Sequence, residues 1–177
     1  MVMLSWGVNF AVTKVGLVQF PPLVMLALRF SIVAAVLLPF VSPPHHRWRE
    51  ILLLSFTLGA LHFALMYNGL AAIDASTAAI AIQLQVPFAA VLAAFYFGDK
   101  LGWRRALGLL IAFAGVVVIA GEPRLEGRYG ALLMVIGAAL VWAISNVQVK
   151  KVSELSPWCV SAWMSPLAAP PLAPPSP

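Results

Sequence analysis

Four residues near the start of the chain could line a small-molecule site because they share one face of a predicted helix. Trp6, Asn9, Thr13 and Gly16 follow the spacing i, i+3, i+7 and i+10, which repeats along one helical face. The surrounding residues are apolar, and polar groups in such a helix tend to face other helices or a cavity. This face therefore either contacts a substrate or holds helices together through hydrogen bonds of about 0.6 kcal/mol each. The sequence leaves both interpretations open.

A second polar face is predicted in a later apolar stretch, between residues 75 and 97. Ser76, Ile80, Gln83 and Pro87 follow a helical spacing, whereas Gln85 points to another side of the same helix. Proline lacks a backbone N–H, so Pro87 leaves free the carbonyl group one turn earlier, near Gln83. A free carbonyl group at membrane depth can line a cavity. The alternative is again that these groups serve helix packing.

Two titratable residues, Arg29 and His62, are predicted to lie deep within apolar segments. Arg29 lies seven residues after Pro22, which is about 10 Å along a helix. It could extend back to the membrane surface, pair with Asp74, or offer its planar guanidinium group to a substrate carboxylate. His62 is predicted near mid-membrane, and we interpret it as a hydrogen-bonded core histidine, with substrate binding as the alternative.

The composition of the chain indicates the environment of these polar residues. Of the 177 residues, 62% are hydrophobic and 10% are charged, and the mean hydropathy is +0.96, whereas a soluble domain carries about 25% charged residues. So much apolar surface requires lipid contact, which predicts an all-α polytopic membrane protein with the bilayer as its partner. The net charge of +5 is interpreted through membrane topology, and no nucleic-acid partner is expected.

No constellation for enzyme catalysis is visible in the sequence. It contains no nucleophile elbow, no P-loop and no HExxH motif. The single cysteine, Cys159, excludes an internal disulfide and a cysteine-based metal cluster. We therefore expect no catalytic residue, no metal and no cofactor.

Six segments are long and apolar enough for a membrane-spanning helix of about 20 residues. They cover about 2–19, 22–42, 51–70, 75–97, 103–121 and 130–149. The connections between these segments alternate: one connection is rich in Lys and Arg, and the next either has few charged residues or has equal numbers of acidic and basic ones. Seven of the eleven Lys and Arg residues lie in the basic connections 43–50, 98–105 and 150–157, which predicts that these connections face the cytoplasm. The chain is accordingly predicted to be a multi-pass protein of the inner, cytoplasmic membrane.

The start of the chain recurs later at a constant offset. The recurring pairs are Trp6 and Trp142, Lys14 and Lys150, Pro21 and Pro157, and Val24 and Val160. Five predicted spans separate the two copies, so the second copy has the opposite orientation in the membrane. Inverted repeats are typical of secondary transporters, whose substrate site lies where the repeats meet.

With these motifs the chain resembles the EamA-type branch of the drug/metabolite transporter superfamily, whose members have ten helices in two inverted five-helix repeats. The resemblance covers about residues 1–165, and the opening stretch is most similar to exporters of O-acetylserine and cysteine-pathway metabolites. The departures are an Asp where the family has Glu, at position 99, and six predicted helices instead of ten. The matching elements are Trp6-Gly7-Val8-Asn9-Phe10, Lys14-Val15-Gly16-Leu17, Pro21-Pro22, Leu28-Arg29-Phe30, Pro87, Gly98-Asp99-Lys100-Leu101 and the glycine-rich segment 108–121.

The resemblance implies a first five-helix repeat, residues 1–121, and the truncated start of a second, inverted repeat, residues 122–165. The proline-rich tail 166–177 is not expected to span, because proline removes a helix donor. The resemblance further implies export of small amino-acid-like metabolites by alternating access, with homodimer formation left open. The alternative is a non-transporting membrane fragment or an assembly partner. The candidate substrate-binding residues are Trp6, Asn9, Thr13, Arg29, His62, Gln83 and Pro87.

Overall fold

The computed structural model describes residues 2–44, 46–98, 101–122 and 125–168, with only the backbone described for residues 2–6 and 97. All regular elements within these ranges are helices, as expected where lipid leaves backbone groups no partner outside their own segment. The all-α bundle predicted from the sequence is confirmed. Asp99 and Lys100, which belong to one of the motifs, and residues 169–177 of the predicted tail lie outside the described residues.

The elements follow one another as helices joined by short connections. The chain begins with α1 (Val2–Gln19) and α2 (Pro22–Leu37), and the short 3-10 turn η1 (Leu38–Phe40) extends α2. The next helix is continuous but changes its winding: α3 (Trp48–Leu54) leads into the π-helical segment η2 (Ser55–His62) and then into α4 (Phe63–Ala72). The helix after it is divided in the same way into α5 (Ala75–Ala81), the 3-10 turn η3 (Ile82–Leu84) and α6 (Gln85–Phe97). The last helices are α7 (Trp103–Ala120), α8 (Tyr129–Lys151) and α9 (Pro157–Ala168).

Five helices within the described ranges are long and apolar enough to cross a membrane. Helix α1 forms where a further span was predicted, but it is not one of the five, because Asn9, Lys14 and Gln19 lower its mean hydropathy. The five spans are Pro22–Phe40, Trp48–Ala72, Ala75–Tyr96, Trp103–Ala120 and Tyr129–Lys151.

Helix α9 is an element that the sequence analysis did not predict. It has 12 residues and is therefore about 18 Å long, which is shorter than the roughly 30 Å hydrocarbon core of a bilayer. It contains Pro166 and continues to Ala168, so its last turn includes the first residues of the predicted tail. A proline this close to a helix end removes few backbone hydrogen bonds, so the helix can pass it.

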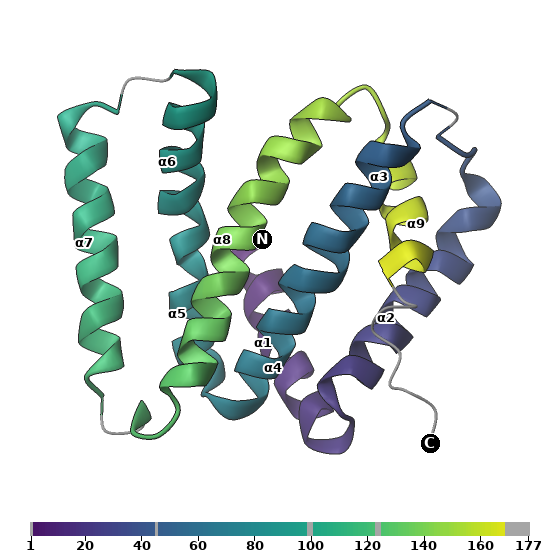
Figure 1. Ribbon diagram of the computed structural model, residues 1–177. Coiled ribbons are helices and arrows are strands. Elements are labelled where there is room, and N and C mark those ends of the chain that lie inside the picture. The colour runs from purple at the N-terminus through teal and green to yellow at the C-terminus, as the bar shows by residue number, and fades with distance from the viewer. Residues whose placement is uncertain (1, 45, 99–100, 123–124, 169–177) are drawn as a thin grey trace.

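The connections between helices gather at two ends of the bundle (Figure 1). At the upper end in this view lie the connections from α2 to α3, from α6 to α7 and from α8 to α9, which are the basic connections of the sequence. The connections from α1 to α2, from α4 to α5 and from α7 to α8 lie at the lower end. Because successive helices alternate in direction, α8 runs opposite to α1 and α9 runs opposite to α2.

Helix α8 is central to the packing and contacts α4, α6 and η2. Its residues Val135, Ala138 and Ala139 are completely buried. The contact with α4 is so close that a Cβ atom at Gly69 would lie 2.6 Å from Val135 Cγ2 and 2.8 Å from the Ala131 carbonyl oxygen. Gly69 thus lets the two backbones approach each other, which is a common way for helices to associate in lipid.

Candidate functional site

A cavity of about 200 Å³ lies among the helices and is bounded by α1, α2, α4 and α8 together with the last residue of η2, the 3-10 turn η3 and the start of α6. A water molecule occupies about 30 Å³ in the liquid, so the cavity can hold a small metabolite. Its lining is mostly apolar, with a few polar groups that could orient a ligand. The lining residues are Asn9, Phe10, Thr13, Arg29, His62, Phe63, Met66, Tyr67, Leu70, Ile82, Gln85 and Trp142.

Irregular helix winding occurs in two of the helices that form this cavity. The π-helical segment η2 ends at His62, and the 3-10 turn η3 directly precedes Gln85. Both His62 and Gln85 line the cavity. Departures from regular α-helix are frequent at functional sites, and in membranes they are tolerated where the chain is buried or borders a cavity.

Arg29 provides the positive charge of the cavity. Its Nη1 atom donates a hydrogen bond to the Tyr67 hydroxyl oxygen at 2.9 Å, and its Cζ atom lies 4.9 Å from the centre of the Phe63 ring. The pairing with Asp74 that the sequence left open does not form; Asp74 is exposed and precedes α5. Among the described lining residues Arg29 is the only one with a permanent charge, so the cavity suits an anionic group.

His62 is a buried, hydrogen-bonded histidine, as interpreted from the sequence, and it also lines the cavity. Its Nδ1 atom lies 2.8 Å from the Ala138 carbonyl oxygen. A carbonyl oxygen can only accept, so Nδ1 carries a proton and donates this hydrogen bond. The ring also contacts Trp142, with the ring centres 5.0 Å apart, which fixes its orientation from the side of α8.

The polar face predicted on α1 lies at this cavity. Asn9 and Thr13 line it, and Thr13 is buried. A Cβ atom at Gly16 would meet the side chain of Met25, so this end of the face packs closely against α2. The backbone of Trp6 belongs to α1, but its side chain lies outside the described residues. Whether Asn9 and Thr13 bind a substrate stays a prediction.

Gln83 and Gln85 lie on different sides of the helix, as predicted, but the side of Gln85 rather than that of Gln83 faces the cavity. Ser76, Ile80 and Gln83 are exposed, while Gln85 lines the cavity. Spacing groups Ser76, Ile80 and Gln83 on one face but does not show which face of an apolar helix turns inward, and the tighter 3-10 turn η3 changes the rotation only from Ile82 onward. Pro87 is buried and follows this turn, but it is not among the lining residues.

Several lining residues were not among the sequence candidates. Phe63 and Tyr67 hold the Arg29 side chain, and their role depends on contacts between helices that spacing does not reveal. Trp142 could have been found, because it is the residue that corresponds to Trp6 in the predicted repeat. The cavity therefore includes a residue from the second copy of the repeated pattern.

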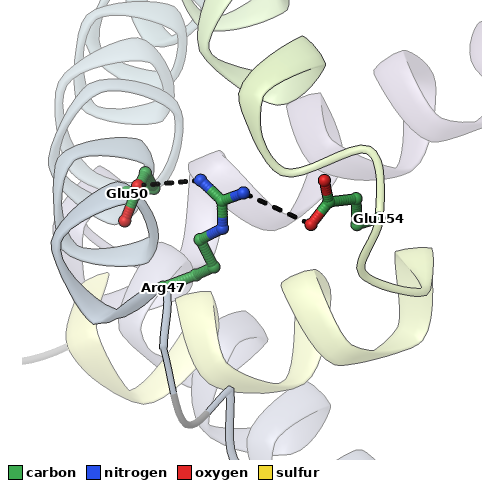
Figure 2. Close-up of polar contacts among 3 residues, drawn as sticks. All are labelled: Arg47, Glu50 and Glu154. Atoms are coloured by element: carbon green, nitrogen blue, oxygen red, sulfur yellow. Dashed lines mark hydrogen bonds and ion pairs between the residues drawn. The ribbon is translucent and has the colours of Figure 1, made fainter.

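An ion-pair group lies at the end of the bundle where the basic connections gather. Arg47 places Nη1 3.2 Å from Glu50 Oε1 and Nη2 3.2 Å from Glu154 Oε2 (Figure 2). The hydrogen bonds to Glu50 and then to Glu154 raise the pKa of the Arg47 guanidinium above its usual value. The group joins the connection before α3 to the connection after α8, but exposed pairs of this kind contribute little to stability. None of its residues lines the cavity.

Comparison with known proteins gives a family match over most of the chain. The EamA-like transporter family matches residues 1–121. A probable amino-acid metabolite efflux pump of Escherichia coli (strain K12) is 34% identical over 160 residues, which are 88% of this chain and 53% of the relative. A protein of the same description from Salmonella typhimurium is 33% identical over 161 residues, which are 89% of this chain and 54% of the relative.

A third similar protein is an uncharacterized inner membrane transporter of Escherichia coli (strain K12). It is 28% identical over 149 residues, which are 80% of this chain and 48% of the relative. The chain thus spans about half the length of these relatives. No solved structure matches the chain.

Proposed function

The chain belongs to the EamA-like transporter family, and from this premise we propose that it forms one part of a secondary transporter that exports small amino-acid-like metabolites by alternating access. The observation that carries the proposal is the half-buried Arg29 in an otherwise uncharged cavity. A charged side chain at this depth is costly in lipid unless it has a partner. A substrate carboxylate is the partner that a planar guanidinium group binds best.

The arrangement of the helices supports alternating access. Helices α8 and α9 run opposite to α1 and α2 (Figure 1), as two inverted repeats would. Both oppositely oriented helix pairs contribute lining residues to the cavity: Asn9 lies on α1 and Trp142 lies on α8. A site where repeats meet is exposed alternately to either side when one repeat rocks against the other.

We further propose that the basic end of the bundle faces the cytoplasm and that the membrane is the inner membrane. In a variant whose Cys159 is replaced by alanine, we expect a cysteine-reactive label outside intact cells to reach a cysteine placed at Gly127. The same label should miss a cysteine placed at His46, because connections with an excess of Lys and Arg stay on the cytoplasmic side of the membrane. Labelling of position 46 but not of position 127 would reverse the proposed orientation.

Transport is tested by supplying the half of the relatives that the chain does not span. The chain is expressed in bacteria that lack their own amino-acid exporters, together with the part of the E. coli relative that lies outside the match. We expect O-acetylserine and cysteine to accumulate in the medium faster than with an empty vector. The chain alone should export nothing, because the mechanism needs two complete repeats. Absence of efflux in every combination would contradict the proposed function and favour a role in assembly.

A further inference from the structure

Gln85 is a cavity residue whose side-chain amide lacks a suitable partner. Its Oε1 atom is buried and has no hydrogen-bond partner among the described residues. Its Nε2 atom lies 3.5 Å from Gln83 Oε1, which is beyond the usual range for N–H···O hydrogen bonds. Gln85 is the first residue of α6 and borders the same cavity as Arg29.

An amide in this position calls for an explanation. A buried acceptor without a partner destabilises the folded chain, and in most proteins such groups are paired. Packing alone would be served better by an apolar residue such as the neighbouring Ile82 or Leu84. The last torsion of a glutamine side chain is broad, so the amide can turn its oxygen toward a molecule in the cavity without moving the helix.

The polar groups that line the cavity differ in whether they can accept a hydrogen bond from a ligand. The Arg29 guanidinium can only donate, and one of its N–H groups already binds the Tyr67 hydroxyl. A substrate that also carries a positively charged amino group needs an acceptor, and none of the described lining residues is Asp or Glu. Gln85 Oε1 is the buried side-chain acceptor without a partner in the described part of the chain.

Building on the proposed function, we propose that Gln85 determines specificity by accepting a hydrogen bond from the amino group of a substrate whose carboxylate binds Arg29. The cavity then selects molecules that carry both groups on a compact apolar body, since Met66, Leu70 and Ile82 form much of its wall. A carboxylic acid without the amino group leaves Gln85 unpaired. A site built for hydrogen bonding rejects such an analogue strongly, because its own polar group then stays unsatisfied.

The experiment measures binding rather than transport, because the described residues that line the cavity can be tested in this chain by itself. The purified chain in detergent is titrated with L-leucine, with 4-methylpentanoate, which lacks the amino group, and with 3-methylbutylamine, which lacks the carboxylate. We expect L-leucine to bind at least about tenfold more tightly than 4-methylpentanoate. In the Gln85→Leu variant this ratio should fall to about threefold or less, with the affinity for 4-methylpentanoate unchanged or higher.

Two further variants make the result specific to position 85. Gln19→Leu changes an exposed glutamine at the end of α1, away from the cavity, and should keep the wild-type ratio. Gln83→Leu tests the exposed neighbour that sequence spacing favoured. The Gln85→Leu variant removes an unpaired polar group and should fold well. If this variant protein accumulates poorly, the Gln85→Met variant is used in its place, because methionine is unbranched like glutamine.

The outcomes separate this inference from the proposed function. If the Gln85 variants keep the full preference for L-leucine, or if Gln83→Leu removes it instead, the inference is overturned while carboxylate binding stands. If the wild-type chain binds 4-methylpentanoate as tightly as L-leucine, Gln85 does not read the amino group. If neither carboxylate binds, the proposed site itself fails, and the role of Gln85 fails with it.

Discussion

Export by the chain paired with the remaining half of a relative is expected to fall at least about tenfold when Arg29 is replaced by lysine. The amount of protein in the membrane should not change, because lysine keeps the positive charge and a long aliphatic stem. The loss is expected in the affinity for substrates that carry a carboxylate. Uptake and release by inverted membrane vesicles, measured over a range of substrate concentrations, would show this loss as a higher KM.

Lysine is expected to bind the substrate carboxylate more weakly because its side chain has a different geometry. The Arg29 guanidinium is held by the Tyr67 hydroxyl at 2.9 Å and lies over the Phe63 ring at 4.9 Å. A planar guanidinium group can keep both contacts and still direct two parallel N–H groups at a carboxylate. A lysine ammonium is a single point charge, so it can take over one of these contacts but not all three together. Charge-assisted hydrogen bonds contribute about 1.5–3 kcal/mol each, so losing one weakens binding roughly tenfold to a hundredfold.

Two matched variants separate binding from structure. Arg105→Lys makes the same exchange at an exposed arginine of α7, outside the cavity, and should leave export unchanged. Tyr67→Phe removes only the hydroxyl that orients Arg29, so it should cause a smaller loss than Arg29→Lys. Normal export by Arg29→Lys would mean that Arg29 serves only its contacts with Tyr67 and Phe63.

The helices could be predicted from the sequence because apolar length is a direct property of the chain. The stretch 75–97 was predicted to its ends, and the helix Tyr129–Lys151 was placed within two residues at each end. Helix α9 was missed because its run of apolar residues is short and ends near prolines, and its burial depends on contacts with α2 and η2. Such contacts have no periodic pattern in the sequence.

The cavity was predictable only in part. Asn9, Thr13, Arg29 and His62 stood out because polar residues are rare in apolar helices. The side of the helix that faces the cavity was not predictable, since spacing separates Gln83 from Gln85 but does not show which of them meets the other helices. The π-helical segment that ends at His62 was unforeseen, because spacing rules assume a regular α-helix.

Lys14 is a second charged residue within an apolar helix, and the structure explains it through the end of another helix. Helix α4 ends at Ala72, and the carbonyl groups of a last helical turn have no partner within the helix. Lys14 Nζ donates hydrogen bonds to the carbonyl oxygens of Leu70, Ala71 and Ile73 at 2.6, 3.0 and 2.7 Å. The carbonyl oxygen of Ala72 accepts a hydrogen bond from Arg128 Nη1 at 3.1 Å. Two cations thus complete the hydrogen bonding of one helix end.

This interaction depends on position rather than on residue type, so the sequence could not reveal it. A cation is favourable at a helix C-terminus, where the carbonyl dipoles concentrate negative charge. Water can replace such a cation at an exposed helix end, but it does so poorly where the last turn is surrounded by other helices and lipid. Leu70 and Ile73 are almost completely buried, so their carbonyl groups depend on Lys14.

Replacing Lys14 by methionine, which has a similar length but no donor, is therefore expected to lower the free energy of unfolding by about 2–4 kcal/mol. The melting temperature of the chain in detergent should fall by roughly 5–15 °C. The Lys14→Arg variant keeps the charge, so its melting temperature should fall by less than half as much. Lys151→Met removes an exposed lysine at the end of α8 and should melt close to the wild type, because the lost charge there is surrounded by water. If Lys14→Met melts together with Lys151→Met, the carbonyl groups at the end of α4 do not need their cation, and the position of Lys14 requires another explanation.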